Sequence, residues 1–360
     1  MSDQPLSPEE VRERIRAGGL LAAGGEDRAS GEGRSAGAGG AERADGAGGN
    51  PIVAMLSGGR DSVCLLDVAV AVCGAARVHA LHVNYGLRPE AGADERHCRE
   101  LCARLGVELE VVPAPPPPAA GNLHAWAREL RYRAAGDLAE REDALIATGH
   151  TATDQVETIL YRLAASPGRR ALLGMAPREG RLVRPLLELT REQTAEYCRA
   201  RGLTWREDTS NDDERFARAR VRNHLLPALD TVHPAARANV LRTARLLREE
   251  AEVLDALVDA ELERDLAACP PAVQGDTRAR EDAPSISIER LRDLPPALAR
   301  LIVVRLAEQV AGAYVPQAGG RVEEILRLAA RGGRAEVHVG GLVGAVVEDG
   351  RLRMVRVPPH

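Results

Sequence analysis

Lysine is missing from the 360-residue sequence, so all 48 basic side chains are arginines. This absence excludes a lysine nucleophile supplied by the protein, and it leaves arginine or a metal ion as the fixed cation of any reaction. Aromatic residues make up only 2% of the chain, so the core must be built mainly from Leu, Val, Ile and Ala. The net charge of −5 gives no overall basic field for nucleic acid. Local arginine clusters can still bind RNA.

The six cysteines include no C-x-x-C pair, and only Cys98 and Cys102 lie one helical turn apart. The pattern gives little support for zinc, an iron–sulfur cluster or a dithiol, and it favours buried free thiols in a reducing cytoplasm. No apolar run is long enough for a membrane span, and the N-terminus lacks the apolar segment of a signal peptide. We therefore expect a cytoplasmic protein with no membrane partner.

The length predicts two or three domains. Residues 1–50 read as an N-terminal extension, and residues 22–50 are so poor in large apolar side chains that we expect them to be disordered. From residue 51 onward, short apolar strands alternate with helices, which predicts an α/β domain over 51–215 with a doubly wound, mostly parallel sheet. The sequence then predicts a helical region over 216–270 and a small α+β module over 285–360.

Expected elements can be placed from apolar periodicity and breaker residues. In the first domain we expect strands at 52–56, 78–83, 107–112 and 144–148, and helices at 62–73, 93–105, 123–141, 153–163 and 191–201. Further along we expect helices at 218–229, 234–268, 288–310 and 321–330, and strands at 337–339, 343–347 and 352–357. Asp349-Gly350 is a typical two-residue hairpin turn.

The first expected strand stops at Ser57-Gly58-Gly59, and Asp61-Ser62 leads into the next helix. A tight glycine turn between strand and helix aims backbone N–H groups and a helix N-terminus at one point, which suits an anion. The motif is neither a Walker A loop nor G-x-G-x-x-G. The alternative is an ordinary strand–turn–helix corner.

Polar residues also follow the second strand, in the segment His82–Arg88, where a nucleotide-facing loop and a plain βα loop are both open. Arg128 and Arg131 are spaced i,i+3 on the helix expected at 123–141, so they share one face. Two guanidinium groups there could bind phosphate, or they could form a solvated charged face.

The fourth strand leads into the segment Gly149–Thr158, where Asp154 and Glu157 are spaced i,i+3 near a helix N-terminus. Two carboxylates on one face could hold Mg²⁺ or attract an ammonium group, or they could simply favour the helix dipole. Further along, Arg218, Arg220 and Arg222 form a basic cluster that could meet RNA or ATP phosphates, or could be a solvated face.

Ser-Gly-Gly-x-Asp-Ser resembles the signature of the PP-loop ATP pyrophosphatases, which split ATP between the α- and β-phosphates. Seven segments together resemble, in this order, the tRNA(Ile)-lysidine synthetase family: Ser57–Ser62, His82–Arg88, Ala127–Tyr132, Gly149–Thr158, Arg184–Leu187, Trp205–Asn211 and Arg218–Pro227. The resemblance covers about half of the chain, from Ile52 to Leu229.

Three positions depart from the family pattern. Thr151 and Thr153 replace the second His and the first Asp of His-His-x-Asp-Asp-Gln-x-Glu-Thr, and Ala219 replaces the Asn of Arg-Asn-x-Ile-Arg. The departures concern the surroundings of the metal and the phosphates, while the main charged groups remain.

The resemblance implies a PP-loop enzyme, a ligase that forms a carbon–nitrogen bond. It implies that ATP adenylates the wobble cytidine of a tRNA(Ile) with the anticodon CAU, and that free L-lysine then displaces AMP to form lysidine. Pyrophosphate and AMP leave, and Mg²⁺ assists. The sequence leaves a homodimer open.

The resemblance also implies a role for each candidate residue. The catalytic set is Asp61, Arg128, Arg131, Asp154 and Glu157, with Asp61 and Asp154 facing Mg²⁺ and Glu157 either holding the lysine ammonium group or helping to remove its proton. The ATP-binding set is Ser57, Gly58, Gly59, Arg60, Asp61, Ser62 and His82. The substrate pocket is lined by Asn84, Gly86, Arg88, His150 and Tyr132, and the tRNA-binding set is Arg218, Arg220 and Arg222.

Three alternatives remain open from the sequence. A two-thiocytidine type of PP-loop tRNA thiolase carries C-x-x-C pairs, which this chain lacks. PP-loop enzymes that amidate with ammonia lack the Arg-Pro-Leu-Leu and Trp-x-Glu-Asp-x-Ser-Asn context. The third alternative is a non-catalytic RNA-binding paralogue, against which the intact Ser57–Ser62 turn argues.

Overall fold

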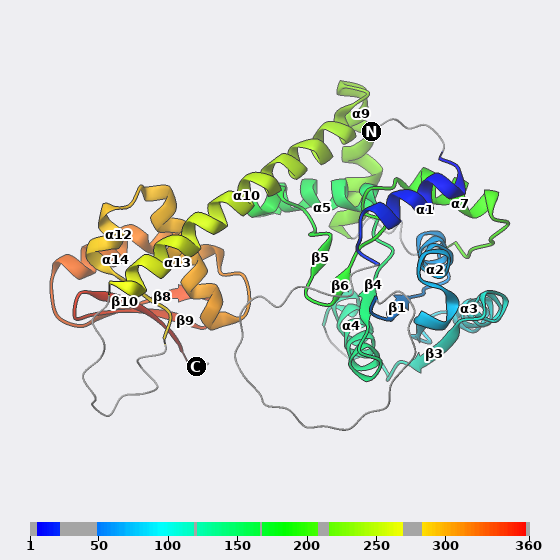
Figure 1. Cartoon of the computed structure of the whole chain (residues 1–360), viewed down its shortest axis with the longest axis horizontal. Helices are drawn as coiled ribbons and strands as arrows, with labels where there is room; N and C mark the ends of the chain where they lie inside the picture. The colour runs from blue at the N-terminus through cyan, green and yellow to red at the C-terminus, as the bar shows by residue number, and fades with distance from the viewer. Residues whose placement is uncertain are drawn as a thin grey trace. The chain divides into compact units, whose positions relative to one another are not determined.

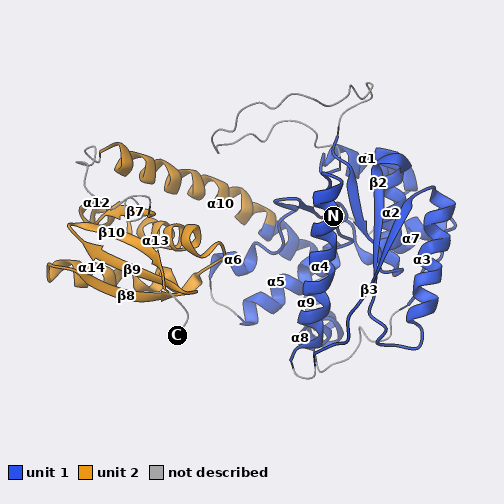
Figure 2. Cartoon of the chain, turned by 90° about the horizontal axis from the view of Figure 1, so that it is seen from below, with its two compact units in different colours: residues 1–244 blue, residues 245–360 orange. Residues whose placement is uncertain are grey.

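The computed structural model describes residues 6–21, 49–118, 121–165, 168–207, 216–268 and 283–357. The chain divides into two compact units, residues 1–244 and 245–360, which Figure 2 colours separately. The segment expected to be disordered, residues 22–50, falls almost entirely outside the described residues. Among the helices that are described, none is both long and apolar enough to cross a membrane.

The first unit is built on a six-stranded sheet with the order β3-β2-β1-β4-β6-β5. Its strands are β1 (Ile52–Met55), β2 (Val78–Asn84), β3 (Glu108–Pro113), β4 (Leu145–Ala147), β5 (Arg178–Glu179) and β6 (Leu182–Val183). All neighbouring pairs are parallel except β5 with β6, which is a short antiparallel edge pair. The predicted mostly parallel, doubly wound sheet is confirmed.

Helices cover both faces of this sheet because successive residues of β1 point in opposite directions. Helices α2 and α7 lie on one side of the sheet and α4 lies on the other (Figure 1). Ile52 and Ala54 pack in one apolar cluster with residues of α1, α2 and α7, whereas Val53 and Met55 pack in another with residues of α4. The helices are α1 (Pro8–Ala17), α2 (Arg60–Cys73), α3 (Ala91–Leu105), α4 (Leu123–Arg141), α5 (Ala152–Ala165), α6 (Arg169–Leu172) and α7 (Arg191–Ala200), with a 3₁₀ turn η1 at Ala75–Arg77.

The helix expected at 218–229 is not continuous. It consists of α8 (Ala217–Arg220), a π-helical segment η3 (Val221–Leu225) and α9 (Leu226–Val232). Pro227 has no N–H to donate to the preceding turn, which accounts for the loss of regular α-helical bonding at this point. Val221 and Leu226 pack against Val156 of α5, so this basic segment is fixed to the helix that follows β4.

The long helix α10 (Ala236–Ala267) spans the boundary between the units, and the second unit follows it. This unit contains β7 (Ser285–Ser287), α12 (Ile288–Asp293), α13 (Pro296–Ala311), η4 (Pro316–Arg321), α14 (Val322–Ala330), β8 (Ala335–Gly340), β9 (Val343–Glu348) and β10 (Arg351–Arg356). The strands form an antiparallel sheet in the order β7-β10-β9-β8.

Two details of the second unit show how the sequence determines local structure. Asp349 and Gly350 both have positive φ, 51° and 73°, and they form the predicted hairpin turn between β9 and β10. The single helix expected at 288–310 is wrong, because Pro295 and Pro296 interrupt it and separate α12 from α13. Strand β7 had no periodic signal in the sequence.

Candidate functional site

The turn after β1 is closed by its own hydrogen bonds. Gly58 has a φ of 82°, a backbone conformation that residues other than glycine rarely adopt. Ser57 donates its backbone N–H to Oγ of Ser62 at 3.1 Å, and Ser62 Oγ donates to the carbonyl of Gly59 at 2.8 Å. Helix α2 begins at Arg60 and adds its N-terminal N–H groups to the turn. The geometry suits an anion at the carboxyl end of β1.

Two neighbouring strands hold this turn in place. An added Cβ at Gly149, just after β4, would lie 3.0 Å from the carbonyl carbon and oxygen of Asp61 and 3.2 Å from the nitrogen of Ser62. The backbone after β4 therefore packs directly on the turn. His82 of β2 is 5% exposed, and its Nδ1 lies 2.9 Å from the carbonyl oxygen of Leu56, the residue before the turn. His82 thus supports the base of the turn.

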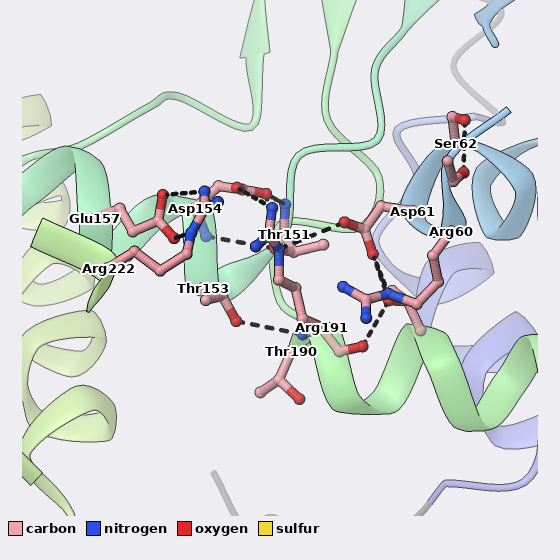
Figure 3. Close-up of polar contacts among 12 residues, drawn as sticks. Arg60, Asp61, Ser62, Thr151, Thr153, Asp154, Glu157, Thr190, Arg191 and Arg222 are labelled. Atoms are coloured by element: carbon pink, nitrogen blue, oxygen red, sulfur yellow. Dashed lines mark hydrogen bonds and ion pairs between the residues drawn. The ribbon is translucent and has the colours of Figure 1, made fainter. Parts of the chain in front are cut away.

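Asp61 and Asp154 face the same guanidinium group, that of Arg191 at the start of α7 (Figure 3). Arg191 Nε lies 3.6 Å from Asp61 Oδ2, and its Nη2 lies 3.6 Å from Asp154 Oδ1. Asp61 also accepts hydrogen bonds from Thr194 Oγ1 at 2.5 Å and from Arg60 Nε at 3.1 Å. The structure thus brings together the two carboxylates that the sequence proposed as metal-facing.

Arg191 and Thr194 were not identified from the sequence. The available signal was local, because Thr190 and Gln193 form a capping box that fixes the start of α7. Thr194 contacts Asp61 across 133 positions of the chain, so no spacing rule could have connected them.

The two threonines that depart from the family pattern have local partners. Thr151 donates its backbone N–H and its hydroxyl to Asp154 Oδ2, at 2.9 and 2.8 Å. Thr153 Oγ1 accepts a hydrogen bond from the backbone N–H of Arg191 at 3.3 Å. Thr151 therefore orients Asp154, and Thr153 ties α5 to the first residue of α7.

The donor set of the site is compatible with Mg²⁺, which prefers carboxylate oxygens. Asp61 and Asp154 converge on one point from two strand ends, as their shared contact with Arg191 shows. Within the ranges that the structure describes, no cluster of three or more His, Cys, Asp or Glu side chains could enclose a metal ion. Asp61 and Asp154 are the residues of this site that could hold such an ion.

Glu157 does not face the same partner as Asp154. It is 2% exposed and accepts two hydrogen bonds from Arg222, Nε to Oε1 at 2.6 Å and Nη2 to Oε2 at 2.9 Å (Figure 3). Between the two acids in sequence, Gln155 bonds both the N–H and the carbonyl of Met175, at 2.6 and 2.8 Å. One turn of α5 therefore contains residues with three different partners.

Arg128 and Arg131 lie on one face of α4, around the ring of Tyr132. Their guanidinium carbons are 4.5 and 5.9 Å from the ring centroid. The hydroxyl of Tyr132 is buried and has no hydrogen-bond partner among the described residues. The arrangement provides two positive groups and a free hydroxyl donor, a combination that suits an anionic group of a ligand.

His150, after β4, lies among these charges. Its Nδ1 is 2.8 Å from Thr148 Oγ1. Burial lowers the pKa of His150 to about 4, against the opposing effect of Asp154, and the positive charges of Arg184, Arg128 and Arg131 lower it further. His150 is therefore neutral at pH 7.

The loop after β2 is organised toward α3. Asn84 donates to Glu95 at 2.7 Å and accepts a hydrogen bond from the N–H of Gly86 at 2.9 Å. Arg88 forms an ion pair with Asp94 at 3.1 Å. Each of these side chains thus has a structural partner on the first turns of α3 or within the loop itself.

The segment that begins at Trp205 reaches the glycine turn through Arg206. The N–H of Arg206 donates to the carbonyl of Gly58 at 2.9 Å, and its Nε donates to Asp94 at 2.9 Å. The rest of the motif, residues 208–211, lies outside the described residues. The sequence marked this segment as a motif, but it gave no indication of the contact with Gly58.

The predicted tRNA-binding arginines differ in their surroundings. Arg218 and Arg220 are exposed on α8, and Arg218 Nη2 lies 3.5 Å from Thr158 Oγ1. Arg222, on η3, is the partner of Glu157 and is only partly exposed. The three therefore do not form one solvent-facing cluster.

Comparisons with known proteins agree with the resemblance found in the sequence. Residues 42–229, just over half of the chain, match the family model of the PP-loop domain. The chain is 39% identical over 208 residues to the tRNA(Ile)-lysidine synthase of Pseudomonas syringae pv. tomato, covering 56% of this chain and 46% of the relative. It is 37% identical to that of Solibacter usitatus over 305 residues, covering 82% and 65%.

A third such synthase, from Symbiobacterium thermophilum, is 36% identical over 327 residues, covering 87% of this chain and 66% of the relative. The chain thus spans between about half and two thirds of the lengths of these relatives. The glycine turn after β1, its contact with the β4 loop and the match over residues 42–229 all lie in the first unit. The chain belongs to the PP-loop domain family.

Proposed function

We propose that this protein ligates L-lysine to carbon 2 of the wobble cytidine of a tRNA(Ile) with the anticodon CAU, using ATP. The observation that carries this proposal is the convergence of the glycine turn, Asp61 and Asp154 at one edge of the sheet. The relatives that match up to 87% of the chain are tRNA(Ile)-lysidine synthases, which supports the choice among PP-loop reactions.

In the first step, the 2-oxygen of the cytosine attacks the α-phosphate of ATP, the bond between the α- and β-phosphates breaks, and pyrophosphate leaves. The N–H groups of the turn Ser57–Ser62 would hold the departing phosphates. Arg128 and Arg131 would stabilise the charge that develops on the α-phosphate, a role for preorganised cations. Asp61 and Asp154 would hold Mg²⁺, which would supply positive charge to neutralise the leaving pyrophosphate.

In the second step, the ε-amine of lysine attacks carbon 2, and the bond from that carbon to the AMP oxygen breaks. The amine must be neutral to attack, so its proton has to pass to an acceptor. We assign the recognition of the ammonium group to Glu157, whose present partner is Arg222. A second cation at Glu157 is disfavoured while Arg222 holds both oxygens, so the assignment requires Arg222 to give up one of them.

The protein offers few aromatic side chains on which RNA bases could stack. We assign tRNA contacts to Arg218, Arg220 and the surface near η3, and we expect base recognition to rely on hydrogen bonds and on arginine stacking. The target base must leave its stack to reach the site.

The experiment combines the purified protein with ATP, Mg²⁺, labelled lysine and a tRNA(Ile) transcript bearing CAU. We expect incorporation of lysine into this RNA and none into a transcript with uridine at the wobble position. A folded protein that incorporates no lysine would overturn the proposal. An Asp61→Ala variant with full activity would overturn the assignment of Asp61.

A further inference from the structure

Arg191 contacts its two carboxylates differently from the way in which Arg222 contacts Glu157. Arg222 makes two hydrogen bonds to Glu157, at 2.6 and 2.9 Å. Arg191 lies 3.6 Å from each of its two carboxylates, and its Nε is buried without a hydrogen-bond partner in the described part of the chain. Arg191 is thus held by charge between two acids rather than by the directed hydrogen bonds that fix Arg222.

The backbone of Arg191 is fixed, whereas its side chain has room to move. Thr153 accepts its N–H, and the capping box of Thr190 and Gln193 fixes the turn that contains it. The side chain is 26% exposed, so the guanidinium group can move toward water without a change in the backbone. Only rotamers need to change for the two carboxylates to be released.

The charges around the two carboxylates balance without a metal ion. Asp61 and Asp154 bring two negative charges, and Arg191 and Arg60 bring two positive charges within 3.6 Å of them. Adding a divalent cation alone would leave an excess of two positive charges in a partly buried space, which is unfavourable. Adding it together with the negative phosphates of a nucleotide removes that excess.

We propose that Arg191 is a positioning residue that acts as a replaceable counter-ion for Asp61 and Asp154. It holds the two carboxylates toward one point in the nucleotide-free protein, and it gives them up when a divalent cation arrives with ATP. The free protein therefore binds divalent cations weakly, and binding of the metal depends on the nucleotide. This inference rests on the proposed metal site, and it goes beyond it by making the loading of that site conditional.

The test measures binding of Mn²⁺ to the nucleotide-free 360-residue protein by the loss of the electron paramagnetic resonance signal of free Mn²⁺. We expect Arg191→Gln to bind Mn²⁺ at least about ten-fold more tightly than the wild type, because a positive charge next to both ligands is gone. Arg191→Lys keeps the charge and should stay near the wild-type affinity. Asp61→Asn in the Arg191→Gln background should cancel the gain and so locate the ion.

Arg199→Gln is the matched control, because it removes one positive charge from the same helix at the end that contacts Trp205. Its Mn²⁺ affinity should not change. Equal Mn²⁺ affinity for Arg191→Gln and the wild type would overturn the proposal. If Arg191→Gln does not fold, Arg191→Met provides a second neutral variant. Tight binding of Mn²⁺ by the nucleotide-free wild type would also overturn the proposal. Because the titration contains neither tRNA nor lysine, its outcome is independent of whether lysine is incorporated.

Discussion

Arg222 donates two hydrogen bonds to Glu157, so that the π-helical segment η3 is joined to α5 by a buried bidentate ion pair. Removing the arginine leaves a carboxylate that is 2% exposed without its partner. We expect Arg222→Met to lower the free energy of unfolding by about 3 kcal/mol, and the double variant Arg222→Met/Glu157→Leu to recover part of that loss. Urea unfolding followed by circular dichroism measures both values.

If the free energy of unfolding of Arg222→Met lies within about 0.5 kcal/mol of the wild-type value, the Arg222–Glu157 pair contributes as little as an exposed ion pair does. Arg220→Met is the matched control, since it removes an exposed arginine two positions away.

The contact between the β4 loop and the glycine turn predicts a steric effect at Gly149. In Gly149→Ala, the new methyl group would meet the backbone of Asp61 at 3.0 Å, and backbone cannot swing away as a flexible side chain can. We expect a loss of about 1–3 kcal/mol in stability together with weaker ATP binding.

Gly136→Ala on α4 is the control, because nothing lies within 4 Å of an added Cβ there. That change should stabilise the protein by about 0.5–1 kcal/mol. Isothermal titration calorimetry measures the ATP affinity of both variants, and urea unfolding measures their stability. An unchanged ATP affinity in Gly149→Ala would contradict the role of this contact.

His150 predicts a dependence of stability on pH. Its pKa in the folded protein is about 4, below the value of about 6.5 in an unfolded chain. Between these values the unfolded chain binds a proton that the folded one does not, so stability falls as the pH drops through this window. The full difference amounts to at most about 3 kcal/mol at the acid end. Unfolding at pH 7 and pH 5 should show a smaller loss in His150→Gln than in the wild type, and equal losses would contradict the pKa shift.

The different surroundings of the three arginines near α8 predict different effects on RNA binding. Because Arg220 is exposed, we expect Arg220→Gln to reduce the slope of log affinity against log salt by about 1 while leaving stability unchanged. Arg104→Gln, at the exposed C-terminal end of α3, should not change the slope. Filter binding with the tRNA transcript from low to moderate salt provides the measurement. A flat salt profile of the wild type would count against a basic RNA-binding face.

Local patterns predicted the first unit well because its strands are short apolar runs next to glycine turns. The helix α4 has the predicted bounds, Leu123–Arg141, and its start is fixed by the side chain of Asn122, which accepts two backbone N–H groups. The capping box of Ser7 and Glu10 likewise begins α1. In these cases the residues that determine the element lie within a few positions of its end.

The parts that the sequence did not predict depend on contacts between distant positions. Asp61 meets Thr194 and Arg191 from another helix, and Glu157 meets Arg222 across 65 positions. The spacing of Asp154 and Glu157 correctly placed both on α5, but spacing cannot report which cation each one faces. The π-helical segment depends on how a single proline is accommodated in a packed helix, and periodicity does not show this.

Ser62 is bonded both to Ser57 and to Gly59, so the turn after β1 is held in one shape by its own hydrogen bonds. The conformational entropy of this segment is therefore lost when the chain folds and not when a nucleotide binds. A nucleotide that reaches the turn has no loop to order. We expect the rate of nucleotide association to be limited by diffusion and by release of Arg191 from its two acids, and not by closure of the turn itself.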